Sequence, residues 1–111
     1  MRYKIVSSLI AVHLFAMLTY AQQKHTLSGT ITDSSTGETM IGATVSVREL
    51  PGTGTISNAY GYYSLTLPEG KYTVTIRFIG FQPFIQSIDL IEDIRIDVAL
   101  RTDAAELEEE V

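Results

Sequence analysis

Few side chains of this sequence have the type and spacing that catalysis or metal binding requires. The two histidines are His13 and His25, and the chain contains no cysteine. Nucleophilic and metal sites draw on clusters of cysteine, histidine, aspartate and glutamate, and His25 has no second histidine or cysteine near it. No glycine-rich loop opens a predicted helix, so phosphate binding is not indicated. The sequence therefore predicts no catalytic residue, no cofactor and no metal ligand.

The segment from Asn58 to Gly61 has a spacing found in cation-binding loops, because a side-chain oxygen precedes a glycine by three positions. The simpler interpretation is a β-turn. In such a turn the Asn58 side chain bonds forward to the backbone, and Gly61 supplies a positive φ angle. Gly70, in a Pro-Glu-Gly connection, and Gly80, after the longest predicted strand, are predicted to be structural turn residues as well.

Tyrosines at the surface could bind sugars by stacking. A period of two places Tyr63 and Tyr72 in the core and leaves Tyr60 and Tyr62 for the surface. Together with the loop of residues 49–55, these two surface tyrosines form a candidate carbohydrate platform. The pattern favours an aromatic lid over the hairpin rather than a glycan site.

Strands must position these side chains, because apolar and polar residues alternate with a period of two through most of the sequence after residue 22. In residues 71–79, for example, Tyr72, Val74, Ile76 and Phe78 alternate with polar side chains. The same alternation predicts strands within residues 26–32, 43–48, 55–57, 62–67, 71–79, 84–90 and 94–100. Short strands with frequent turn signals are typical of two packed sheets. We therefore expect an all-β domain, a seven-stranded antiparallel β-sandwich.

The first 21 residues have the layout of a secretory signal peptide. A short basic start is followed by an apolar run of about 14 residues, too short for a bilayer-spanning helix of about 20. Small Ala21 then precedes polar Gln22. The sequence predicts a signal peptide helix over 1–21, cleavage between Ala21 and Gln22, and export of the remaining chain.

Composition excludes several kinds of partner. Two of the eight basic residues lie in the signal peptide, so six bases face thirteen acids in the mature chain, a net charge of −7. A negative net charge disfavours binding to nucleic acid, because neutralising the phosphates needs clustered Lys and Arg. It disfavours binding to anionic lipid as well. The lack of cysteine excludes lipid attachment at a cysteine after the signal, and the fold must be held by core burial.

After the domain of residues 22–101, residues 102–111 form an acidic segment with little apolar mass. Its composition predicts a solvated linker. Leu107, Glu108, Glu109, Glu110 and Val111 form its candidate partner-binding tail.

Several ordered blocks resemble a known family. They are Ser28-Gly29-Thr30-Ile31-Thr32-Asp33, Ile41-Gly42-Ala43-Thr44-Val45, Asn58-Ala59-Tyr60-Gly61-Tyr62-Tyr63, Pro68-Glu69-Gly70 and Phe78-Ile79-Gly80-Phe81. In this order they resemble the carboxypeptidase regulatory-like domain over about residues 25–100. The resemblance implies a transthyretin-like sandwich. The family usually has aspartate where Asn58 stands, which keeps the turn-making oxygen.

The order of signal peptide, sandwich and acidic segment resembles the start of SusC/RagA-type TonB-dependent outer-membrane transporters of Bacteroidetes. This resemblance implies a non-catalytic domain on the periplasmic face of the outer membrane, in a transporter of a glycan or peptide nutrient. The implied partners are its own plug and barrel, a TonB-type energy-transducing protein and a SusD-like surface lipoprotein. In that family the tail leads to a TonB box, which pairs with its partner as an added strand. Without plug and barrel, this chain alone is not expected to transport.

Two other functions stay open at the level of sequence. One is a free-standing extracytoplasmic module that binds carbohydrate or protein. The other is an accessory domain of a secreted zinc carboxypeptidase. The gene sequence downstream of residue 111 separates the three, because it encodes a plug and barrel, a stop codon or a peptidase.

Overall fold

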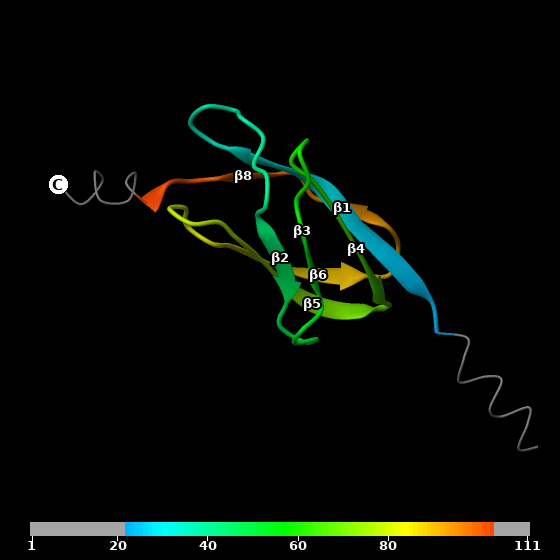
Figure 1. Ribbon diagram of the computed structural model, residues 1–111. Coiled ribbons are helices and arrows are strands. Elements are labelled where there is room, and N and C mark those ends of the chain that lie inside the picture. The colour runs from blue at the N-terminus through cyan, green and yellow to red at the C-terminus, as the bar shows by residue number, and fades with distance from the viewer. Residues whose placement is uncertain (1–21, 104–111) are drawn as a thin grey trace, which may run out of the picture.

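The computed structural model describes residues 22–103, which form eight strands (Figure 1). They are β1 Lys24–Asp33, β2 Thr44–Val47, β3 Gly54–Ile56, β4 Tyr62–Pro68, β5 Gly70–Arg77, β6 Phe84–Leu90, β7 Ile94–Arg95 and β8 Val98–Leu100. Within the described range, no helix is long and apolar enough to cross a membrane. The predicted signal peptide, residues 1–21, lies outside the described residues.

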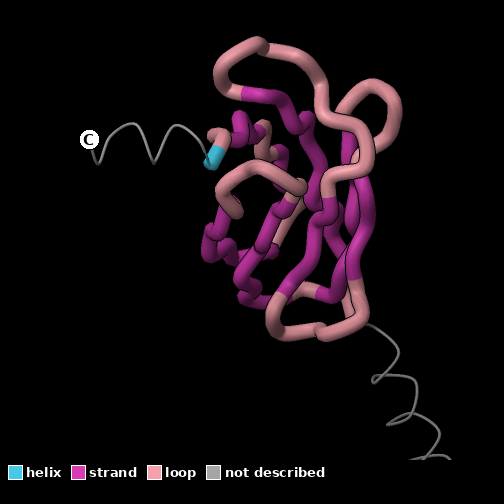
Figure 2. The backbone as a smooth tube through the Cα atoms, turned by 60° about the vertical axis from the view of Figure 1, so that its left-hand side comes forward, coloured by secondary structure: helices cyan, strands magenta, loops and turns pink. Residues whose placement is uncertain are grey.

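The strands build two sheets that face each other, with the connecting loops at their ends (Figure 2). One sheet has β1 in its middle, paired with β4 on one side and with β7 and β8 on the other. The second sheet has the order β3-β2-β5-β6, and all its pairs are antiparallel. The expected all-β sandwich is confirmed.

The core lies between the sheets and is made by the alternating residues of the strands. In β4, Tyr63, Leu65 and Leu67 are buried while the residues between them are exposed. β5 buries Val74 and Ile76 in the same way, against the other sheet. Each buried large aliphatic side chain contributes about 1.5–3 kcal/mol. The period of two in the sequence therefore predicts most of the core correctly.

The last predicted strand differs from the expectation in two ways. Residues 94–100 form two short strands, β7 and β8, and both run parallel to β1. The break between them lies at Asp97, whose carboxylate Oδ1 accepts the Thr30 N–H at 2.9 Å, where a backbone carbonyl of a continuous ladder would stand. The register is the same on both sides of this break, because Ser28 pairs with Arg95 and Ile31 with Val98. The structure therefore has eight strands, and one side of β1 is not antiparallel.

Gly29 allows β1 to approach the break closely. A Cβ atom at this position would lie 1.9 Å from the backbone oxygen of Ile96. Directly across from Gly29 in the ladder is Tyr63 of β4, and its phenol donates a hydrogen bond of 2.7 Å to that same Ile96 oxygen. Because residue 29 has no side chain, the Tyr63 hydroxyl of β4 can reach across β1 to the Ile96 carbonyl.

Candidate interaction site at the 78–83 turn

The connection between β5 and β6 is a tight turn that presents apolar side chains to solvent. The Phe81 N–H donates to the Phe78 carbonyl at 3.1 Å, and Gly80 has a φ of 84°. A glycine with positive φ at the third position is what a type II turn requires. The rings of Phe78 and Phe81 meet edge to face, with centroids 5.7 Å apart. Ile79, at the tip of the turn, is 95 % exposed.

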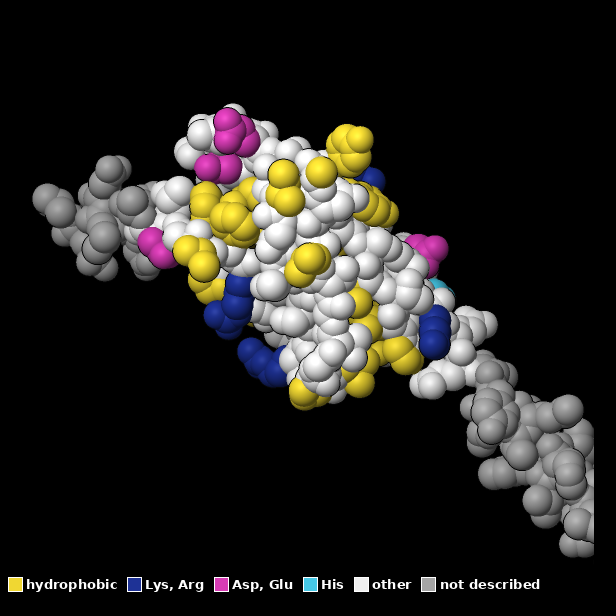
Figure 3. Space-filling view, viewed as in Figure 1, with side chains coloured by type: hydrophobic (Ala, Val, Ile, Leu, Met, Phe, Trp, Pro, Cys, Tyr) yellow, Lys and Arg dark blue, Asp and Glu magenta, His cyan; other side chains and the backbone are white. Residues whose placement is uncertain are grey.

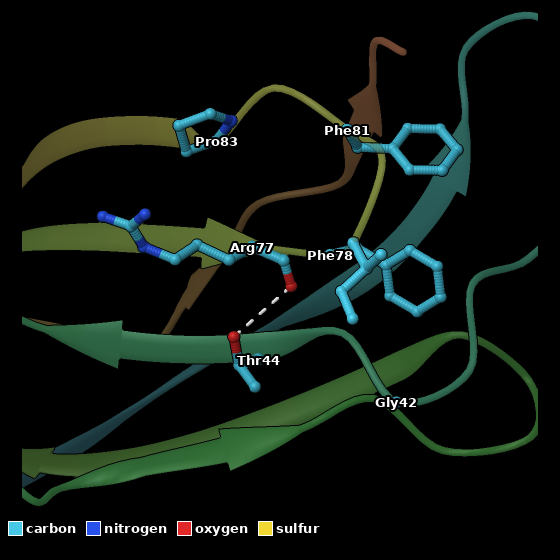
Figure 4. Close-up of a pocket in the computed structure, with 7 residues that line it drawn as sticks. Gly42, Thr44, Arg77, Phe78, Phe81 and Pro83 are labelled. Atoms are coloured by element: carbon cyan, nitrogen blue, oxygen red, sulfur yellow. Dashed lines mark hydrogen bonds between the residues drawn. The ribbon is translucent and has the colours of Figure 1, made fainter. Parts of the chain in front are cut away.

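A hollow of about 430 Å³ lies beside this turn (Figure 4). It is lined by Gly42, Thr44, Arg77, Phe78, Ile79, Phe81 and Pro83. The Thr44 hydroxyl donates to the Arg77 carbonyl at 3.3 Å, which fixes the start of β2 against the end of β5. In the close-up, the two phenylalanine rings lie at one end and the Arg77 guanidinium points the other way. The hollow therefore combines an apolar wall with one cationic group.

A second hollow, of about 350 Å³, shares the two phenylalanine rings. Its other lining residues are Asp33, Glu38, Thr39, Met40 and Ile41. Hydrogen bonds from Ser35 lower the pKa of the Asp33 carboxyl below its usual value. Figure 3 shows hydrophobic side chains gathered between acidic and basic groups on this face of the molecule. The phenylalanine pair thus separates an anionic hollow from a cationic one.

The chain leaves the sandwich at the same turn. Gln82 N–H donates to the Arg101 carbonyl at 2.7 Å, and Thr102 forms an antiparallel bridge with Phe81. Asp103 N–H then donates to the Gly80 carbonyl at 3.1 Å. Backbone contacts with the turn therefore continue to the last described residue.

The turn residues predicted from sequence lie at the positions expected for them, with one difference. Asn58 Oδ1 accepts the N–H groups of Tyr60 and Tyr62 at 2.9 and 3.1 Å. Gly61 has a φ of 73°, and a Cβ there would lie 2.8 Å from the Ile31 carbonyl oxygen. Gly70 differs, since it is the first residue of β5 and its φ is not positive.

The structure does not bring the residues of the candidate carbohydrate platform together. Tyr60 is 79 % exposed on the turn that follows β3. Residues 49–53 precede β3 and lie at the other end of that strand, and residues 54–55 belong to β3 itself (Figure 1). The candidate platform is therefore divided between the two ends of β3.

In the part of the chain that the structure describes, the buried Nε2 of His25 has no hydrogen-bond partner, and it lies 3.9 Å from Glu69 Oε2. Among residues 22–103, no group of three His, Asp or Glu side chains lies close enough to hold a metal ion. Gln22, the predicted first mature residue, is exposed. Ala21 and the tail residues Leu107, Glu108, Glu109, Glu110 and Val111 lie outside the described residues.

Sequence reasoning missed the hollow beside the 78–83 turn. Its lining comes from two segments about thirty positions apart, residues 42–44 and 77–83, which the β2–β5 pairing brings together. One signal was present in the sequence: Phe78, Ile79 and Phe81 occupy a turn, where polar residues are the rule. Apolar side chains in such a place indicate a contact surface.

Solved structures with the same fold have different functions. Catechol 1,2-dioxygenase of Acinetobacter radioresistens aligns with a TM-score of 0.59 at 10% identity, over 77% of this chain and 54% of its own. 5-Hydroxyisourate hydrolase of Klebsiella pneumoniae aligns with a TM-score of 0.56 at 24% identity, over 69% of this chain and 90% of its own. A Bacteroides fragilis protein described as membrane-associated and of unknown function aligns with a TM-score of 0.52 at 22% identity, over 75% of this chain and 29% of its own. The chain thus spans about half the dioxygenase and less than a third of the Bacteroides fragilis protein, and these likenesses show the fold alone.

Comparison with curated proteins found no match. Comparison with family models found a match: the model of the CarboxypepD_reg-like domain matches residues 27–111, which is most of the chain. The matched range begins in β1, includes every later strand and continues through the acidic tail. By this match, the chain belongs to the CarboxypepD_reg-like domain family.

Proposed function

We propose that this chain is the non-catalytic, periplasmic N-terminal domain of a SusC/RagA-type TonB-dependent outer-membrane transporter for a glycan or peptide nutrient. The observation that carries the proposal is that the family match extends to residue 111. Sandwich and acidic tail are therefore matched as one unit, in the order expected for such a domain. The predicted signal peptide before them supports export.

A role in interaction agrees with the chemistry of the described surface. The hollow beside the 78–83 turn is lined by two phenylalanines, an isoleucine and a proline, with a glycine, a threonine and a single arginine. Such a lining can hold another side chain or a peptide, but it offers no nucleophile with a neighbouring base. The partners we propose are the plug and barrel of the same polypeptide, a TonB-type energy-transducing protein and a SusD-like lipoprotein.

The decisive experiment is to sequence the gene beyond the codon for Val111 and to locate its product. We expect a plug and barrel, and a full-size product in the outer-membrane fraction when cells are probed with an antibody against residues 22–101. A stop codon would replace this proposal with a free-standing module. A zinc peptidase downstream would make the domain an accessory of that enzyme.

Export is tested separately by sequencing the N-terminus of the protein recovered from cells. We expect it to begin at Gln22. An intact Met1 on the recovered protein would contradict the signal peptide.

The hydrolase neighbour suggests one enzymatic test, because that protein is covered over 90% of its length. We expect the purified chain to leave 5-hydroxyisourate decay at the uncatalysed rate. Turnover that survives removal of contaminating hydrolase, and that depends on His25, would overturn the non-catalytic assignment.

A further inference from the structure

We propose that the hollow beside Arg77 is a docking site for the chain's own segment 104–111, with Leu107 against the phenylalanine wall. This rests on the proposed function in one respect, because that segment contains the tail expected to meet the energy-transducing protein. Docking would then cover the tail until a partner competes for it.

The point at which the described chain ends favours this occupant. Asp103 is hydrogen-bonded to Gly80, which stands between Ile79 and Phe81, two residues of the hollow's lining. Leu107 follows Asp103 by four positions in the sequence, and an extended chain spans up to about 13 Å over that length. Leu107 can therefore reach the hollow without any change in the sandwich.

The chemistry of the segment matches the hollow. Leu107 is its one large aliphatic side chain before Val111, and three glutamates lie between them. The hollow offers the ring faces of Phe78 and Phe81 for the leucine and the Arg77 guanidinium for a carboxylate. Among residues 22–103, Arg77 has no ion pair, so its charge is available to a glutamate.

Charge also selects between the two hollows that share the phenylalanine rings. The second hollow contains Asp33 and Glu38, which repel an acidic segment. The hollow beside Arg77 contains no acid among its lining residues. An acidic peptide with one leucine is therefore directed to the Arg77 side of the rings.

Tethering compensates for the small size of the contact. A short linker holds the segment near the hollow at an effective concentration in the millimolar range. A contact that would be too weak for a free peptide can then be substantially populated. It still exchanges quickly, so the segment stays available to a partner, as a solvated linker must.

The test compares backbone amide spectra of the mature chain, exported and purified, with those of a variant that ends at Asp103. We expect shift differences at Gly42, Thr44 and residues 77–81, and none around Asp33 and Glu38. Leu107→Ser and Arg77→Gln should each reproduce the shifts of the truncated chain over residues 42–44. Lys71→Gln is the matched control for Arg77, since it removes a cation from the same outer face of β5 at its other end, and it should preserve docking.

Unchanged spectra on truncation, or changes confined to the Asp33–Glu38 side, would overturn the docking. So would a Lys71→Gln effect equal to that of Arg77→Gln, because it would reveal a general charge effect. Leu107 follows the last strand in the sequence, so we expect its variant to test docking without endangering the fold. The outcome is independent of the gene sequence downstream, and failure of the docking is therefore distinguishable from failure of the proposed transporter role.

Discussion

Among residues 22–103, Tyr63 contributes the one tyrosine hydroxyl that forms a hydrogen bond across the middle strand of a sheet. The ring is 1 % exposed, and burial, together with nearby Asp97, raises the pKa of the phenol to about 12. Tyr63→Phe keeps the ring but leaves the Ile96 carbonyl without its donor, which we expect to cost about 1–3 kcal/mol in urea unfolding. Tyr62→Phe, on the outer face of the same strand, should cost less than about 0.5 kcal/mol.

The same phenol predicts a loss of stability in alkali. The folded state favours the neutral form, so this contribution is complete below the unfolded pKa of about 10. It should fall as the pH rises from about 10 toward 12. In Tyr63→Phe the unfolding free energy should change less over that window, and an identical pH profile would contradict the assignment.

Asp97 should act at the other end of the pH range. The Thr30 N–H and the Arg95 side chain bond to its carboxylate and lower its pKa. A lowered folded pKa means that the contribution is present above the unfolded value, near 4, and is lost as the pH falls further. Asp97→Asn keeps an oxygen for Thr30 but cannot titrate. We expect the variant to be less stable than wild type at pH 7 and the difference to shrink at pH 3. A difference that stays the same at both pH values would contradict this role of Asp97.

Strands are the part of this molecule that local pattern predicts well. Alternation identifies β4 and β5 because one face of each is buried and the other faces water. The division between β7 and β8 could not be predicted, since Asp97 looks like any outward polar residue until its carboxylate is seen to replace a ladder acceptor. The hollow beside Arg77 could not be predicted either, because it depends on which strands pair and not on their pattern.

The two faces of β5 give a direct test of this layering. Val74 is 1 % exposed. Val74→Asp would bury an unpaired charge, which we expect to lower the free energy of unfolding by about 3–5 kcal/mol. Thr75→Asp, next along the strand and facing outward, should change stability by about 0.5 kcal/mol. Thermal melting of both variants checks the difference, and equal losses would mean that the strand is buried on both faces.

The close approach of β1 to the 96–97 break gives a second test at this level. Gly29→Ala places a methyl group where the Ile96 oxygen stands, so the strands must separate. We expect a loss of about 1–3 kcal/mol, the usual cost of overpacking. Gly70→Ala is the control, because its new methyl group would meet only the Tyr72 ring at an ordinary 3.6 Å. A harmless Gly29→Ala would show that the sheet adapts at this point.

The molecule as a whole is organised around β1, which joins the start of the described chain to its end. β4 pairs along one side of it, and the last two strands pair along the other. A lesion in β1 therefore disturbs one entire sheet, while the second sheet is assembled from β2, β3, β5 and β6. The described chain begins and ends at opposite ends of the sandwich (Figure 1).

The parallel pairing of β1 with β8 has a mechanical consequence. Traction on Gln22 and Asp103 pulls the two strands lengthwise in opposite directions, so that the bonds joining them are loaded together in shear. Traction on Gly70 and Leu90, which are paired at the open end of the β5–β6 hairpin, opens bonds one at a time. Forced unfolding follows the barrier and not the equilibrium stability, so the same domain should resist pulling at its ends with a higher force than pulling across the hairpin. Single-molecule stretching in the two geometries measures this, and Asp97→Ala should weaken only the first.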